Sequence, residues 1–134
     1  MNVIKLTDTL GVSQQISPAN VAEIAAAGYQ VLINNRPDGE EPNQPGNDEI
    51  AAAAQAAGLE YYYLPITAMN FPGPDFDQMR QLLADPAKPV LAFCRTGTRC
   101  TNLWVASHEG DSRQQAAIQA RQLGYDLGMV GRLG

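Results

Sequence analysis

The run Cys94-Arg95-Thr96-Gly97-Thr98-Arg99-Cys100 stands between two segments of different character. The apolar stretch 89–93 before it is typical of a buried strand, and 101–106 after it is typical of the start of a helix. The backbone N–H groups of such a loop, together with the N-terminus of the following helix, favour an anion. The same field lowers the pKa of a cysteine and stabilises its thiolate. The run therefore predicts a nucleophile and a seat for a tetrahedral oxyanion in one loop, although a cysteine at a strand end can also be a small buried hydrophobe.

Strands and helices alternate along the rest of the chain. The predicted strands are 10–16, 29–34, 61–66 and 89–93. The predicted helices are 18–28, 47–58, 74–85, 101–106 and 111–123, with Ser17 and Asp111 as caps of the first and the last. This order predicts an α/β fold, a single domain over residues 1–134 with a mainly parallel sheet flanked by helices. The tail 125–134 receives no assignment.

Ligands of such sheets bind beyond the carboxyl ends of the strands, so the loops that leave those ends are expected to meet. Three loops qualify: 34–46, 67–73 and 94–100. This topology puts the turn Arg36-Pro37-Asp38 at the rim of the cysteine loop, and the alternative is a rigid surface turn held by Pro37 and Gly39. It also offers candidates for a general acid, which are Asp38, Glu40, Glu41, Asp75 and Asp77. Each of these carboxylates is equally compatible with a solvated surface or a helix cap.

The composition is that of a globular protein. The chain has 134 residues, 45% of them apolar and 17% charged, and a net charge of −5. This charge argues against nucleic acid as a partner, because no broad basic surface is available to neutralise phosphates. The sequence contains no apolar stretch long enough to cross a membrane and no signal-peptide pattern at Met1, so a cytoplasmic location is expected.

The number and positions of the cysteines argue against a disulfide framework and against a metal site. Both cysteines lie in the same loop, and His108 is the one histidine of the chain, at the expected end of a helix. One histidine and two cysteines cannot complete a four-ligand zinc site without carboxylates. We therefore expect no metal and no cofactor. Two of the nine basic residues fall within 94–100, and a local positive focus on an acidic chain suits a small anionic substrate.

Three segments in this order, 33–41, 58–65 and 89–99, resemble the phosphatase-like domain of bacterial beta-lactamase-hydrolase-like proteins. That group is related to the protein tyrosine and dual-specificity phosphatases. The resemblance covers roughly residues 10–125 and implies a cysteine-phosphatase-like fold. It also implies that Cys94 attacks phosphorus and that Arg99 holds the phosphate oxygens. The residues expected to complete the anion site are Arg95, Thr96, Gly97, Thr98, Cys100 and Arg36.

The chain departs from the usual tyrosine-phosphatase pattern in three places. Four residues separate Cys94 from Arg99 where five are usual, and Phe93 replaces the histidine that commonly precedes the nucleophile. Thr67 stands where dual-specificity enzymes often carry the acid aspartate. The shortened loop also resembles the Cys-Arg-x-Gly-x-Arg loop of rhodanese-type sulfurtransferases. Related bacterial proteins carry this domain fused to sulfur-metabolism enzymes.

Three functions therefore stay open. The first is a phosphatase that forms a phosphocysteine on Cys94, with Asp38 or Asp75 as possible acid. The second is a sulfurtransferase that carries a persulfide on Cys94 and has less need of an acid. The third is a non-catalytic module that binds anions or phosphopeptides. The sequence does not indicate the natural substrate or the oligomeric state.

Cys100 also has two interpretations. It can replace a small serine-like residue at the helix entry, or it can resolve an oxidised or persulfidated Cys94 by forming a disulfide. Because helix N-termini depress thiol pKa values, we expect Cys100 to be partly ionised as well.

Overall fold

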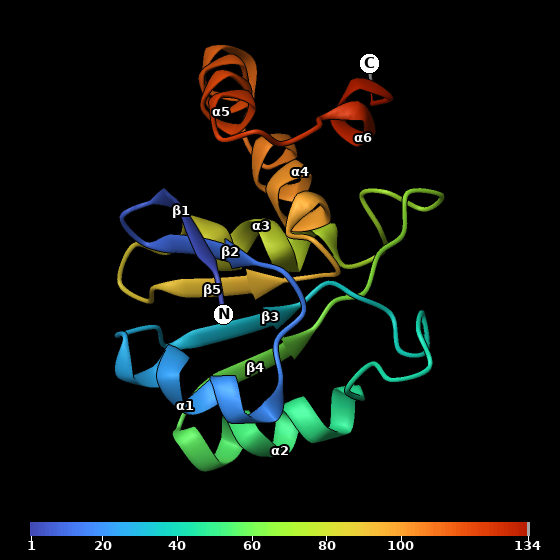
Figure 1. The fold of residues 1–134 in the computed structure, drawn as a ribbon. Helices are drawn as coiled ribbons and strands as arrows, with labels where there is room; N and C mark the ends of the chain where they lie inside the picture. The colour runs from blue at the N-terminus through green and yellow to red at the C-terminus, as the bar shows by residue number, and fades with distance from the viewer. Residues whose placement is uncertain (134) are drawn as a thin grey trace.

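The computed structural model describes residues 1–133 and contains one five-stranded sheet with helices on both faces (Figure 1). The strands are β1 (Val3–Thr7), β2 (Leu10–Ser13), β3 (Val31–Asn34), β4 (Glu60–Tyr63) and β5 (Val90–Phe93). The helices are α1 (Pro18–Ala26), α2 (Asn47–Ala57), α3 (Phe76–Ala84), α4 (Thr98–Ala106), α5 (Gly110–Gln122) and α6 (Gly128–Gly131).

The sheet has the order β1-β2-β5-β3-β4. All neighbours from β2 to β4 are parallel, and only β1 runs antiparallel, paired with β2 at the edge. The predicted α/β fold with a mainly parallel sheet is therefore confirmed. The chain crosses from the edge strand β4 back to β5 at the centre of the sheet, so the carboxyl end of β5 lies between those of β2 and β3.

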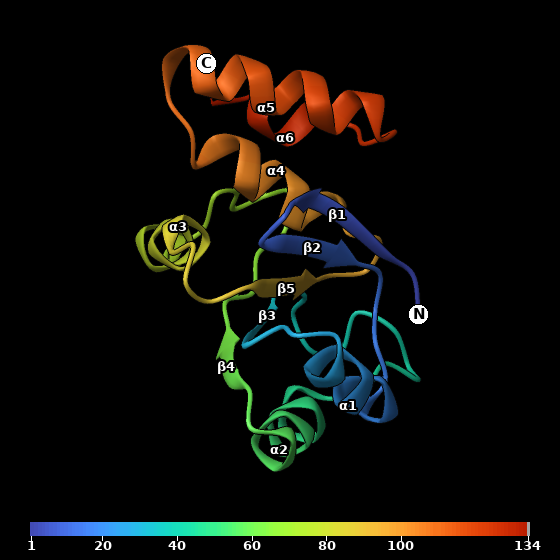
Figure 2. The ribbon, with the colours of Figure 1, turned by 90° about the vertical axis from the view of Figure 1, so that its left-hand side faces the viewer.

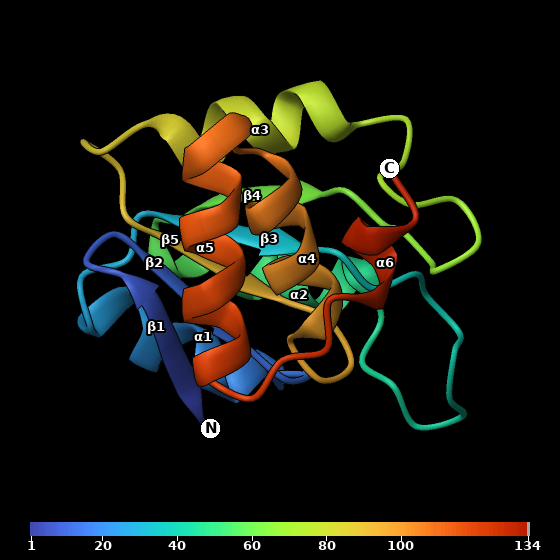
Figure 3. The ribbon, with the colours of Figure 1, turned by 90° about the horizontal axis from the view of Figure 1, so that it is seen from above.

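Side chains of the strands alternate between two cores, one on each face of the sheet. In β5, Val90 and Ala92 belong to the core under α3, α4 and α5, whereas Leu91 and Phe93 belong to the core under α1 and α2. Cys94 continues this alternation and joins the first core. Figure 2 shows α1 and α2 on one side of the sheet and the later helices on the other. Figure 3, seen from above, shows α4 and α5 lying across the sheet. Phe93 is thus a fully buried core residue that faces away from the α4 side.

The helix boundaries differ from the predicted ones where a backbone feature overrides the pattern. The helix predicted at 101–106 begins earlier, at Thr98, because Gly97 with φ of 89° forms its N-cap. This places Arg99 in the first turn of α4. The expected cap Asp111 is wrong, since α5 starts at Gly110 after the N-cap residue Glu109.

The two ends of the chain complete the α4 side of the sheet. β1 was not predicted, and the tail holds the short helix α6. The Asn102 side chain ties α4 to this tail: its Nδ2 donates to the Asp126 carbonyl at 2.9 Å, and its Oδ1 accepts from the Val130 N–H at 3.1 Å. No helix within residues 1–133 has both the length and the apolar character that a membrane span requires.

Candidate active site

Cys94 lies at the carboxyl end of β5 with its sulfur inside the loop that follows. The side chain is fully buried, and the Gly97 N–H donates to Cys94 Sγ at 3.1 Å. The pKa of Cys94 is lowered to about 6. The largest cause is a hydrogen bond from the Cys100 thiol. Burial opposes it, and the backbone N–H groups of Cys100, Thr96 and Arg99 reinforce it. Cys94 is therefore mainly a thiolate at neutral pH.

Gly97 is required by the shape of this loop. Its φ of 89° lies in the region that side chains rarely adopt. A Cβ at this position would also lie 3.3 Å from the Tyr125 hydroxyl oxygen and 3.5 Å from the Ser13 carbonyl oxygen. The glycine lets the chain turn tightly enough to aim its own N–H at the sulfur of Cys94.

The pKa of Cys100 is shifted in the opposite direction to that of Cys94. Its thiol is buried in the first turn of α4, and its pKa is raised well above the ordinary value, first by burial and then by its contact with Cys94. The expectation that Cys100 is partly ionised is therefore wrong. The pair of thiols carries one negative charge at neutral pH. This charge is on Cys94, where backbone N–H groups of the loop stabilise it. Cys100 remains a neutral thiol that donates to the thiolate.

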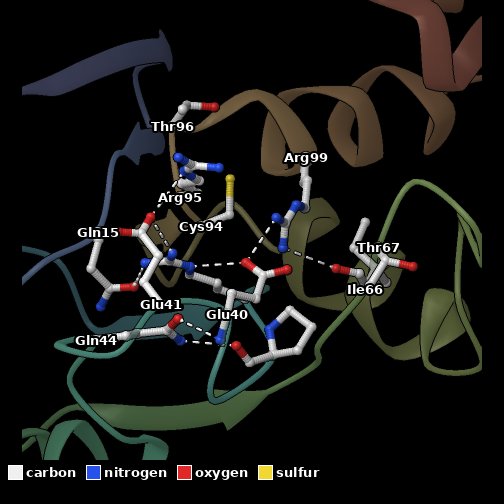
Figure 4. Close-up of polar contacts among 12 residues, drawn as sticks. Gln15, Glu40, Glu41, Gln44, Ile66, Thr67, Cys94, Arg95, Thr96 and Arg99 are labelled. Atoms are coloured by element: carbon white, nitrogen blue, oxygen red, sulfur yellow. Dashed lines mark hydrogen bonds and ion pairs between the residues drawn. The ribbon is translucent and has the colours of Figure 1, made fainter.

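Arg99 is held from two other loops. Its Nη1 donates to the Ile66 carbonyl oxygen at 3.2 Å, just beyond β4, and its Nη2 donates to Glu40 Oε1 at 2.9 Å. Figure 4 shows these two contacts on either side of the guanidinium group, with Cys94 close by. The three predicted loops thus meet at the carboxyl edge of the sheet. A guanidinium has five N–H donors, so these two contacts leave others for oxygen atoms of a ligand.

Arg36 lies behind the loop rather than at its rim. Its side chain is 3% exposed and each of its nitrogen atoms is occupied. Nε donates to Glu40 Oε1 and Nη2 to Glu41 Oε1, both at 2.9 Å, and Nη1 donates to Gln15 Oε1 at 3.1 Å. A buried arginine needs such partners, because an unpaired buried charge is strongly destabilising. Arg36 therefore organises the carboxylates instead of offering itself to a substrate.

The same two glutamates reach the two arginines of the cysteine loop. Glu40 Oε1 accepts from both Arg36 and Arg99, and Glu41 Oε1 accepts from Arg36. Glu41 Oε1 also forms an ion pair with Arg95 Nε at 3.1 Å. We call these five residues the Arg36 network, and Figure 4 labels four of them, Glu40, Glu41, Arg95 and Arg99. Through it, one buried arginine fixes the positions of both loop arginines.

The Arg36 network also decides the charge of Glu40. Partial burial raises the pKa of this carboxyl, but the hydrogen bonds and charges of Arg99 and Arg36 outweigh burial and lower the pKa. Glu40 is therefore an ionised acceptor at neutral pH and a poor proton donor.

The other predicted acids lie elsewhere. Asp38 Oδ1 accepts from the Asn47 N–H at 2.8 Å and so caps α2. Asp75 is exposed at the N-cap of α3, and Asp77 pairs with Arg80 at 3.1 Å. Thr67, at the position where an acid is usual, accepts from the Met69 N–H through its hydroxyl in a local turn. Of the five carboxylates considered, only Glu40 and Glu41 reach the cysteine loop.

Several groups at the site carry no sequence signal. The Ile66 carbonyl acts through its backbone, and Tyr125 comes from the unassigned tail. Burial raises the pKa of Tyr125, which keeps its hydroxyl neutral against Gly97. Among the remaining loop residues, Thr96 donates through its hydroxyl to Thr98 at 3.0 Å. His108 lies after α4, where its Nδ1 contacts the Trp104 carbonyl oxygen at 2.8 Å.

Comparison with known proteins gives a consistent result. Residues 2–111 match the family model of the phosphatase-like domain of beta-lactamase hydrolase-like proteins. The beta-lactamase hydrolase-like protein of Xylella fastidiosa is 35% identical over 131 residues, which are 96% of this chain and 30% of that protein. The chain thus spans about 30% of the length of the curated relatives it matches.

Solved structures agree with this match. A protein of Neisseria meningitidis, crystallised as a proposed phosphatase, is 34% identical with a TM-score of 0.79, and the likeness covers 99% of this chain and 96% of that one. Tk-PTP, crystallised in its active form, is 22% identical with a TM-score of 0.64, over 90% of this chain and 82% of that one. At that identity the likeness concerns the fold alone.

Proposed function

Because this chain belongs to the family of phosphatase-like domains of beta-lactamase hydrolase-like proteins, we propose that it hydrolyses a phosphomonoester through a phosphocysteine on Cys94. The observation that carries this proposal is the position of Cys94 in the loop, where the Gly97 N–H donates to its sulfur at 3.1 Å and the surrounding donors lower its pKa to about 6. A thiolate that is ionised at neutral pH and faces backbone N–H groups beside Arg99 has the charge and surroundings that attack on a phosphoryl group needs.

The reaction has two steps. Cys94 Sγ attacks phosphorus, the bond between phosphorus and the ester oxygen breaks, and the leaving oxygen takes a proton from solvent. Water then attacks the phosphocysteine, the sulfur–phosphorus bond breaks, and dihydrogen phosphate and the Cys94 thiolate are released. Arg99 and the loop N–H groups stabilise the phosphoryl oxygens in both steps. The Cys100 thiol, which donates to Cys94, stabilises the leaving thiolate in the second.

Within residues 1–133, none of the candidate acids is placed as a neutral proton donor for the leaving group. Glu40 is ionised between two arginines, and Asp38 and Asp75 lie elsewhere. A general acid usually contributes about 10²–10⁴-fold to the rate. Substrates with acidic leaving groups, such as aryl phosphates, are therefore favoured over alkyl phosphates, whose leaving oxygen needs a proton earlier.

The test gives the purified chain an aryl phosphate and, in parallel, thiosulfate with cyanide. We expect release of phosphate that is lost in Cys94→Ser, and no thiocyanate above the rate of that variant. Equal phosphate release by wild type and Cys94→Ser would contradict the proposal. If neither reaction occurs but phosphate still binds, the chain is a non-catalytic anion-binding module.

One observation favours a second candidate, a rhodanese-like sulfurtransferase. Only four residues separate Cys94 from Arg99, and Glu40, the carboxylate that contacts Arg99, is ionised and cannot serve as the general acid, which sulfur transfer does not need. In that reaction Cys94 thiolate attacks the outer sulfur of thiosulfate, the sulfur–sulfur bond breaks, and sulfite leaves. Cyanide then takes the sulfur from the persulfide and restores the thiolate. Thiocyanate formation that requires Cys94, without phosphate release, would establish this reaction instead.

A further inference from the structure

A groove of about 390 Å³ adjoins the cysteine loop. Its lining residues are Gln14, Gln15, Arg36, Glu41, Asn43, Gln44, Pro45, Arg95 and Thr96. Since Arg95 and Thr96 belong to the loop itself, the groove continues the site of Cys94 toward the 36–46 segment. Every lining side chain except Pro45 is polar or charged, and none is aromatic. The groove therefore suits a polar group and offers no stacking surface for an aromatic ring.

Most of the polar atoms in this groove are already used within the protein. Gln15 donates to the Ile16 carbonyl oxygen and accepts from Arg36, and Gln44 donates to the Pro37 carbonyl oxygen and accepts from the Glu40 N–H. These amides shape the wall rather than bind a ligand.

Arg95 is different. Its side chain is 63% exposed, and only its Nε is engaged, by Glu41 Oε1 at 3.1 Å. Within residues 1–133, its two terminal nitrogen atoms have no hydrogen-bond partner. Glu41 is itself held by the buried Arg36, so the Arg95 guanidinium is anchored on one edge and open on the other. An anchored guanidinium loses less conformational freedom on binding and can grip a carboxylate or a phosphate with two parallel hydrogen bonds.

The charges at the groove also favour an anionic ligand. The Arg36 network, which includes Arg95, contains three arginines and two glutamates, so it has one positive charge in excess on a chain whose net charge is −5. An anionic group is therefore attracted to this part of the surface, next to the loop that takes the reacting anion.

We propose that this groove is a subsite for a second anionic group of the substrate, gripped by Arg95. The substrate is then a small molecule that carries a carboxylate or a second phosphate on its leaving part, rather than a phosphotyrosine side chain. This inference rests on the proposed function, since it takes the reacting phosphoryl group to lie at Cys94 and Arg99.

Three probes that cannot be hydrolysed test the subsite by calorimetry on the whole chain: methylphosphonate, phosphonoacetate and phosphonoacetamide, in which a neutral amide replaces the carboxylate of phosphonoacetate. We expect phosphonoacetate to bind about tenfold more tightly than the other two, as one charge-assisted pair would give. In Arg95→Gln this preference falls below about twofold, since the amide has no charge to offer. The matched control is Arg80→Gln. Arg80 is also half-exposed, at 47%, and pairs with a carboxylate at 3.1 Å, but it lies on α3. This variant keeps the full preference.

The outcomes distinguish failure of the proposed subsite at Arg95 from failure of the proposed phosphate site at Cys94 and Arg99. Equal affinity for all three probes, with clear binding of methylphosphonate, overturns the subsite and leaves the phosphate seat standing. A preference for phosphonoacetate that depends on Arg95 without measurable binding of methylphosphonate supports the subsite and contradicts the seat. Binding of none of the probes overturns both. A preference that survives in Arg95→Gln shows that another group grips the second anion and overturns the role of Arg95.

Discussion

Cys94 and Cys100 lie in one loop, yet their thiols ionise at different pH. Hydrogen bonds from the Cys100 thiol and from the loop N–H groups lower the pKa of Cys94, whereas burial and the contact with Cys94 raise the pKa of Cys100. Alkylation by iodoacetamide should report this directly. The thiolate is the reactive form, so the rate at Cys94 rises with pH through about 6 and is level above neutrality, with about nine-tenths thiolate at pH 7. Cys100→Ala removes the thiol that donates to Cys94 and should move the midpoint upward by about one pH unit, whereas Cys100→Ser keeps a donor and restores most of the shift. An unchanged midpoint in Cys100→Ala would contradict this account.

The contact between the two sulfur atoms makes a second outcome testable. Peroxide would oxidise the Cys94 thiolate to a sulfenic acid, and the Cys100 thiol would then displace water to form a disulfide. We expect mass spectrometry to find an intramolecular link in the wild type that thiols reverse and that is absent from Cys100→Ser. Finding only sulfinic or sulfonic acid at Cys94 of the wild type would exclude the resolving role of Cys100.

Glu40 joins Arg36 to Arg99 through a single oxygen atom, and this makes it a positioning residue. Glu40→Gln keeps the shape but removes a negative charge beside the anion seat. The KM for an aryl phosphate should then fall, because repulsion is relieved, while kcat falls about tenfold because Arg99 is less firmly placed. Steady-state kinetics separate the two effects. Glu49→Gln, an exposed residue in the first turn of α2, is the control and should change neither constant. A kcat unchanged in Glu40→Gln would remove the positioning role.

At the scale of elements, the junction between β5 and α4 carries the site. Gly97→Ala puts a Cβ near the Tyr125 hydroxyl at a positive φ, so we expect the free energy of unfolding to fall by about 1–2 kcal/mol in chemical denaturation. Alkylation of Cys94 should slow as well, because the Gly97 N–H no longer meets its sulfur. Tyr125→Phe combined with Gly97→Ala relieves the crowding but not the backbone strain, so only part of the stability should return. Wild-type stability of Gly97→Ala would show that the loop is not constrained as described.

Sequence patterns predicted the elements well where burial was continuous and less well where local backbone features decide. The apolar runs that became β3 and β5 were found because both faces of these strands are covered. The edge strand β1 was missed, since its half-buried pattern is shared by many loops. The early start of α4 depends on the conformation of Gly97, which no periodicity reveals.

At the scale of the whole molecule, topology predicted where the loops would meet but not how their charges would pair. The parallel sheet brings Glu40, Ile66 and Arg99 together, as the expected meeting of three loops requires. Arg36 is buried and paired with Glu40 and Glu41 because of the path of segment 36–46. The sequence shows no regular pattern in this segment that would predict its path. The contact of Tyr125 with the loop depends on α5 and α6 returning the tail to the sheet edge.

The central claim is that a phosphoryl group passes through Cys94. Its most direct test is peptide mass spectrometry of the wild-type chain, rapidly quenched during turnover of an aryl phosphate. We expect a peptide that carries the mass of one phosphoryl group on Cys94. It should be absent from Cys94→Ser and accumulate to a larger fraction in Cys100→Ala, where the leaving thiolate is less stabilised. Phosphate release with an unmodified Cys94 throughout, or a phosphoryl group found on another residue, would contradict the central claim.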